Sequence, residues 1–133
     1  MLLVFVRNAR LFDKNMKLSV DWNQNYKNRI TREFQELEYD SCFLFLEYVK
    51  TLIPSGSDGG QCKYADFESN HGLGISAVSI NVPLIFTYLN VSQLNTEQLQ
   101  DKLNNNFKNF QSISDYKITE ANFKFIMSLE DCY

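Results

Sequence analysis

Histidine, proline and glycine are scarce in this sequence of 133 residues, which contains one, two and five copies of them respectively. Zinc sites usually need several His or Cys ligands at short spacing, and His71 accompanies three cysteines that show no C-x-x-C motif. The Gly-Leu-Gly at 72–74 does not complete a dinucleotide fingerprint, and the Ser-Asp-Gly-Gly at 57–60 lacks the Lys-Ser/Thr of a phosphate-binding loop. We therefore expect neither a metal nor a cofactor.

Long apolar runs are also absent. No stretch approaches the roughly 18 residues of a membrane-spanning helix, and the apolar run at residues 1–6 is too short for a signal peptide. The three cysteines Cys42, Cys62 and Cys132 cannot all pair within one chain, so reduced thiols are the simplest interpretation. These features predict a cytoplasmic protein that does not associate with a membrane.

The length predicts a single globular domain that spans residues 1–133. Its net charge of −3 argues against nucleic acid as a direct partner. The charge is unevenly distributed, because residues 1–32 carry seven Lys or Arg and two Asp, whereas residues 33–68 carry eight acids and two bases. The acidic segment 33–68 has a net charge of −6, so its charge differs most from that of the whole chain.

The first part of the chain has the pattern of a β-hairpin. Residues 2–6 form an apolar run typical of a buried strand, and residues 8–14 are expected to turn. Residues 17–22 alternate apolar and polar side chains, which predicts the second arm.

A helix is expected at residues 30–52, which contain no proline or glycine and carry apolar residues at helical spacing. The sequence favours a break near Ser41, which could cap a second helical segment. Residues 42–49 form an alternative strand, because Cys-Phe-Leu-Phe-Leu is also typical of a buried strand and periodicity does not decide between the two.

The longest β-like block lies at residues 71–90. Because proline lacks a ladder donor, Pro83 predicts an interruption near 81–83 that divides the block into two neighbouring strands. A shorter strand is expected before it, at 62–68, and a final hairpin is expected at 116–119 and 122–129.

The second helix is predicted at residues 95–110. Asn95 can cap its first turn, and Leu99, Leu103 and Phe107 recur at helical spacing on one side. Together the elements predict an α+β fold: a mostly antiparallel sheet of five to seven strands with two or three helices packed on one face. A doubly wound parallel sheet is the alternative.

Candidate catalytic groups are few. A Cys62–His71 or Cys42–His71 pair could supply a nucleophile and a base, although isolated cysteines are more often small core residues. Glu33, Glu36 and Asp40 would share a helical face, and paired carboxylates can do acid–base chemistry; a solvated helix face is the ordinary interpretation. We predict no catalytic site.

The acidic segment 33–68 interleaves its carboxylates with aromatic residues. Aromatic anchors surrounded by charge of one sign are typical of protein-binding faces, although most of these rings could equally fill the core. The candidate partner-binding residues are Glu33, Glu36, Glu38, Tyr39, Asp40, Asp58, Tyr64, Asp66 and Glu68.

These observations predict a small acidic protein that binds and neutralises a basic protein partner. In size, acidity and lack of catalytic residues the chain is similar to bacterial immunity proteins, which block a cognate secreted toxin such as a nuclease. That similarity implies an acidic surface that covers a cationic active site and speeds association. The alternatives are a small hydrolase or transferase that uses the carboxylates or a Cys–His pair, and a structural or adaptor subunit of a larger assembly.

Overall fold

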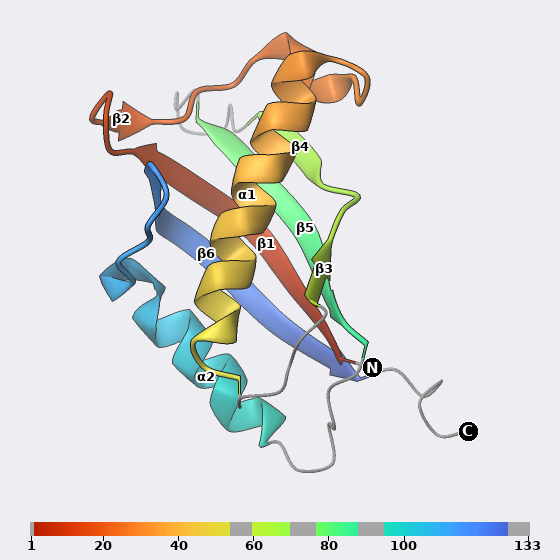
Figure 1. Ribbon diagram of the computed structural model, residues 1–133, viewed down its shortest axis with the longest axis vertical. Coiled ribbons are helices and arrows are strands. Elements are labelled where there is room, and N and C mark those ends of the chain that lie inside the picture. The colour runs from red at the N-terminus through yellow and green to blue at the C-terminus, as the bar shows by residue number, and fades with distance from the viewer. Residues whose placement is uncertain (1, 54–59, 70–76, 88–94, 128–133) are drawn as a thin grey trace.

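The central element of the structure is the long strand β1 (Leu2–Asp13), which is paired on both sides (Figure 1). Along one side it pairs with β6 (Tyr116–Met127), and on the other it pairs with β5 (Val78–Phe86) and, near its end, with β2 (Leu18–Ser19). The computed structural model describes residues 2–53, 60–69, 77–87 and 95–127.

Two short strands and two helices complete this architecture. The strands β3 (Gly60–Cys62) and β4 (Asp66–Ser69) pair with the far side of β5, so the sheet has six strands. The helix α1 (Arg32–Lys50) crosses one face of the sheet, and α2 (Thr96–Asn106) lies beside the edge strand β6 (Figure 1). Every strand pair in the described ranges is antiparallel, so the α+β prediction is confirmed and the parallel alternative is wrong.

Two 3-10 helices, η1 (Gln24–Lys27) and η3 (Phe107–Asn109), precede α1 and follow α2. Among the residues that the structure describes, no helix is long and apolar enough to cross a membrane.

A first hairpin is present, but it is much smaller than predicted and lies later in the chain. Residues 2–6 do not pair with residues 17–22; only Leu18 and Ser19 pair, with Asp13 and Phe12 of β1. The expected turn at 8–14 is wrong because β1 continues through a bulge, where the register with β5 shifts between Val6 and Ala9. Asn8 takes the left-handed conformation (φ 52°), and its N–H donates to Asn81 Oδ1 at 3.1 Å. Asparagine tolerates this conformation, so the extra residue is accommodated and Ala9 stays on the buried face.

In the described part of the block at 71–90, residues 77–87, the chain forms one strand through Pro83, not the two that we expected; residues 71–76 and 88–90 lie outside the described residues. β4 pairs with residues 78–81 of β5 and β3 pairs with residues 84–86, so residues 82 and 83 have no partner in either strand. Proline is tolerated where a ladder is interrupted, and β5 therefore runs through it. The predicted strand at 62–68 is correspondingly split into β3 and β4 at Tyr64, whose φ is 64°.

The predicted C-terminal hairpin is wrong as well. Residues 116–127 form the single strand β6, which pairs with β1 from Leu2 to Asp13 and absorbs two register shifts. A long partner strand makes this possible, because β6 can follow β1 instead of folding back on itself.

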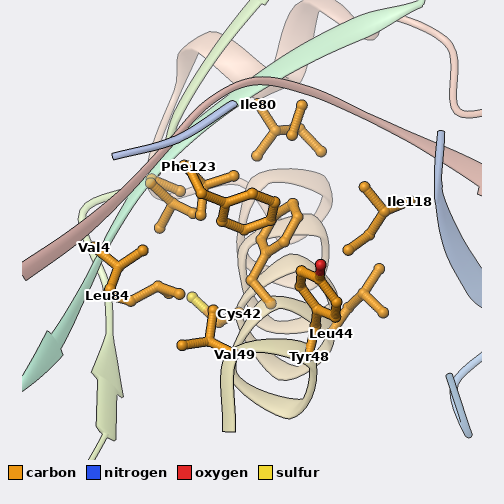
Figure 2. Close-up of a cluster of buried hydrophobic side chains, with 14 of the residues drawn as sticks. Val4, Cys42, Leu44, Tyr48, Val49, Ile80, Leu84, Ile118 and Phe123 are labelled. Carbon is orange, nitrogen blue, oxygen red and sulfur yellow. The ribbon is translucent and has the colours of Figure 1, made fainter. Parts of the chain in front are cut away.

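The helix α1 is continuous, so both the predicted break at Ser41 and the alternative strand at 42–49 are wrong. Thr31 caps its first turn by accepting a hydrogen bond from Phe34 N at 3.3 Å. Ser41 is fully buried within the helix, because it lies on the stripe that faces the sheet. Figure 2 shows side chains of α1 meeting those of the sheet in one core: Val4, Cys42, Leu44, Tyr48, Val49, Ile80, Leu84, Ile118 and Phe123.

The helix α2 begins as predicted. Asn95 Oδ1 accepts a hydrogen bond from Gln98 N at 3.0 Å. Leu103 and Phe107 are buried but Leu99 is only partly buried, and the α-helix ends at Asn106, before the predicted end at residue 110. The Tyr48 hydroxyl donates to Leu103 O at 2.6 Å and joins the two helices. Burial raises the pKa of Tyr48 to about 12, so this phenol remains a donor at neutral pH.

Side chains of α2 cap the backbone of the edge strand β6. Asn104 Oδ1 accepts from Phe123 N at 2.7 Å and Asn104 Nδ2 donates to Phe123 O at 2.9 Å. Gln100 Oε1 accepts from Phe125 N at 2.8 Å. An uncovered edge strand can pair with another chain, and these amides occupy the backbone groups that would do so.

We expect Asn104→Ala to destabilise the protein by about 1–3 kcal/mol, because two backbone groups of β6 lose their partner. Asn105→Ala is the matched control: it makes the same change in helix propensity at an exposed position of α2, and we expect it to stay within about 0.5 kcal/mol of wild type. Chemical denaturation of the three proteins measures the difference. Equal stabilities would contradict the edge-capping role.

A disulfide joins Cys42 of α1 to Cys62 of β3. The expectation of reduced thiols is therefore wrong for these two residues, because the fold brings together cysteines that are 20 positions apart, with a Cα–Cα distance of 5.4 Å. The bond fastens the short strand β3 to the helix. The expectation of a cytoplasmic location rested on reduced cysteines, and it loses that support.

Closing a loop between residues 20 positions apart stabilises a fold by about 3 kcal/mol in the chain-entropy model. We therefore expect dithiothreitol to lower the melting temperature of the oxidised protein. The variant Cys42→Ser with Cys62→Ser should melt at the lower temperature and should not respond to the reductant. Mass spectrometry of the unreduced protein should recover the two cysteine peptides linked; their recovery as separate thiols would contradict the bond.

Candidate protein-binding groove

The outward side of α1 and the segment that leads into β6 form a groove of about 380 Å³. The helix contributes Tyr39, Asp40 and Phe43, and the other wall is residues 113–116. We call this feature the α1 groove. A second hollow of about 430 Å³ adjoins it along the helix and shares Tyr39 and Asp40 with it.

Hydrogen bonds hold the far wall of the α1 groove in place. The Lys14 ammonium donates to Ser112 O and Ser114 O, both at 2.8 Å. Glu47 Oε1 of α1 accepts from Ile113 N at 3.1 Å. Two charged side chains therefore fix the backbone of this segment against β1 and α1.

Large apolar side chains project from this fixed frame. Ile113 is 84% exposed, Tyr39 is 71% exposed and Phe43 is 43% exposed. They come from two elements, yet they border one groove. An apolar cluster with a polar surround is typical of a protein interaction site.

The electrostatics of the α1 groove are acidic. Burial raises the pKa of Asp40 above its ordinary value, and Glu36 and Asp115 raise it further. The pKa of Tyr116 is also raised, first by burial and then by Asp40. Because each carboxylate disfavours the ionisation of its neighbours, the groove favours the arrival of a cation.

The first turns of α1 extend the same acidic side. Glu36 Oε1 accepts from Arg32 Nε at 2.7 Å in an exposed ion pair, so part of its charge is compensated. Glu33 lies near Tyr26, whose pKa is raised by burial and then by Glu33. The structure thus brings together Glu36, Tyr39 and Asp40 and places Glu33 beside them.

The remaining predicted residues do not join this groove. Glu38 Oε2 accepts from Ala65 N at 3.0 Å, so it fastens the β3–β4 connection to α1. Tyr64, Asp66 and Glu68 line a different groove, on the sheet. Asp58 lies outside the described residues.

The Cys–His candidate for catalysis is weakened, whereas the paired carboxylates Glu36 and Asp40 do lie together on α1. Cys42 and Cys62 are bonded to each other, so neither is a free nucleophile for a Cys–His pair, and His71 lies outside the described residues. No group of three or more potential metal ligands occurs in the part of the chain that the structure describes.

The residues that sequence reasoning missed are Ile113, Ser114 and Asp115. They follow the second helix and have no periodic pattern. Ile113 is a single apolar residue between two serines, and because single exposed apolar residues are common on protein surfaces, the sequence carried no signal for it.

Comparison of the chain with protein-family models, with curated proteins and with solved structures gave no match. The interpretation of the α1 groove therefore depends on its own geometry and charge.

We expect Asp40→Asn to raise the stability of the protein at neutral pH, because the fold disfavours the ionised carboxyl. The pKa of Asp40 is higher in the folded state than in the unfolded state. Below the unfolded-state pKa, wild type and variant should therefore have the same free energy of unfolding. As pH rises through the folded-state pKa, wild type should lose stability relative to the variant. Thermal melts across this pH range measure the effect. Asp101→Asn, at an exposed position of α2, is the control; a gain as large as that of Asp40→Asn would assign the effect to net charge.

Proposed function

We propose that this protein binds and neutralises a basic partner protein through the α1 groove. The observation that carries this proposal is the presence of exposed Tyr39, Phe43 and Ile113 beside Asp40 and Asp115 on one fixed groove. Aromatic and aliphatic anchors supply most of the binding energy in protein interfaces. Carboxylates around them select a cationic partner and speed its arrival.

The chemistry of the α1 groove suits a lysine or arginine side chain of the partner. Burial is the main cause of the raised pKa of Asp40, and repulsion from Glu36 and Asp115 adds to it; a guanidinium or ammonium group would relieve this repulsion. The exposed Tyr39 ring could cover the same cation with its face. An extended basic surface is therefore a better fit than a neutral or acidic one.

The class that combines these properties is the immunity protein, and we propose a bacterial immunity protein that blocks a secreted toxin. A nuclease is a suitable target, since its active site is cationic and an acidic face would cover its substrate channel. The Cys42–Cys62 bond favours an encounter in an oxidising compartment over the cytoplasm.

The test begins with the oxidised protein as bait in a native lysate, followed by purification of the captured protein. We expect a stoichiometric basic protein that associates more slowly as salt increases. Glu36→Lys with Asp40→Lys should slow association by at least about tenfold at low salt, and Tyr39→Ala should weaken binding by about 2 kcal/mol, mainly through faster dissociation.

Glu97→Lys with Asp101→Lys is the matched control, because it changes the net charge equally at exposed positions of α2. It should leave the association rate near that of wild type. If both double variants act alike, or if the captured protein is acidic, the α1 groove is not the binding site. Turnover of a substrate by the isolated chain would support the alternative of an enzyme, and capture of a multisubunit scaffold would support an adaptor.

A further inference from the structure

The helix α1 lies against one face of the sheet (Figure 1), and apolar side chains of β1 alternate onto the opposite face. In β1, the buried residues Leu2 and Val4 point toward the helices, and Leu3 and Phe5 alternate with them on the other face. We call this other side the open face.

The strand register arranges the open face in rows. In the first row, Leu3 of β1 lies between Ile126 of β6 and Ile85 of β5, and Gln61 of β3 follows Ile85. Ile126 is 38% exposed. The centre of this row is therefore aliphatic from β6 to β5.

In the second row, Phe5 lies between Lys124 of β6 and Pro83 of β5. Beyond Pro83 lies a groove of about 530 Å³, which Phe5 and Pro83 line together with Tyr64 and Asp66. One end of the row is thus basic and its middle is apolar. Its other end is a hollow in which two carboxylates, Asp66 and Glu68, outnumber one cation, Arg7, and which contains the exposed Tyr64 ring. We call this hollow the β4 groove.

The backbone around the β4 groove is unusual. Asn8 and Tyr64 both line it, and they are two of the three non-glycine residues with a left-handed φ among the described residues. Such a conformation is unfavourable for a tyrosine and tends to occur where function requires it. The bulge in β1 at Asn8 borders the same groove, and bulges are also frequent beside binding sites.

We propose that the open face binds a second copy of this chain about a two-fold axis that runs parallel to the strands between β1 and β5. This axis places β6 of one copy over β4 of the other, and β1 of one copy over β5 of the other. Each row of one copy therefore faces the same row of the other copy, with the order of the strands reversed. Leu3 would face the partner copy's Ile85, and Phe5 would face the partner copy's Pro83. Lys124 would then reach the β4 groove of the other copy, where Asp66 offers an ion pair.

Charge complementarity selects this orientation. An axis perpendicular to the strands would place the two β6 rims together, with Lys117 and Lys124 of both copies on the same side. It would also place Asp66 and Glu68 of one copy against the same acids of the other. Like charges across an interface disfavour association, whereas the parallel axis pairs each basic rim with an acidic one at two symmetric positions.

We expect the dimer to be reversible. Its contact spans four strands, about 19 Å across, and is limited to one face of the sheet, so we expect it toward the small end of specific interfaces. Because α1 lies on the opposite face of the sheet (Figure 1), the dimer would leave the α1 groove free and would present two such grooves together. The dimer does not depend on the proposed function.

Sedimentation velocity on the oxidised full chain from about 1 µM to about 1 mM tests the proposal. We expect a concentration-dependent dimer. Lys124→Glu and Asp66→Lys should each weaken it at least about tenfold, and the two reversals combined should restore it to near the wild-type dissociation constant. Lys102→Glu, at an exposed position of α2, is the charge-matched control and should leave the dimer unchanged.

Zero-length carbodiimide cross-linking supplies an independent measurement. Within one copy, Lys124 and Asp66 are separated by three strand spacings, about 14 Å, which excludes a direct bond. A cross-link between them in a mixture of isotopically light and heavy chains must therefore join two copies. Three results would overturn the proposal: a monomer over the whole concentration range, a dimer that the single reversals leave intact, or a double reversal that does not restore the dimer. Any of them would assign the face to a different partner.

Discussion

The pairing of β1 on both of its sides is the constraint on which the rest of the structure depends. A strand of twelve residues with neighbours along both edges must bury its apolar side chains on at least one face. Within the described residues the helices satisfy this need on one side only, so one face of the sheet is covered by helices and the other, the open face, is not. The length of β1 also explains why β6 is a single strand.

Interactions between side chains and backbone then fix the helices and connections onto this sheet. A hydrogen bond from Tyr48 connects α1 to α2, and hydrogen bonds of Asn104 connect α2 to the edge of β6. The Cys42–Cys62 disulfide connects α1 to β3. Lys14 and Glu47 fasten the segment before β6 in the same way. Because that segment is fixed, the exposed Ile113 is presented in a defined position, as an interface anchor requires.

The acidic segment 33–68 does not form one surface. Glu36, Tyr39 and Asp40 lie on the outward side of α1, whereas Asp66 and Glu68 lie across the sheet on β4. We therefore propose two interaction surfaces of different character. One is an acidic groove with exposed apolar side chains for a basic partner, and the other is an apolar sheet face with opposite net charges at its two rims for a second copy of the chain.

The sequence by itself determined the class of the fold and both helices, because helical spacing, the Asn95 cap and strand alternation are local signals. It also pointed to the acidic side of α1. Only the tertiary structure decided that β5 runs through Pro83 and that Cys42 pairs with Cys62. It likewise decided that Ile113 and Asp115 complete the groove begun by Tyr39. Each of these depends on contacts between residues far apart in the chain, and no local pattern encodes which distant neighbour a strand, a thiol or a loop will meet.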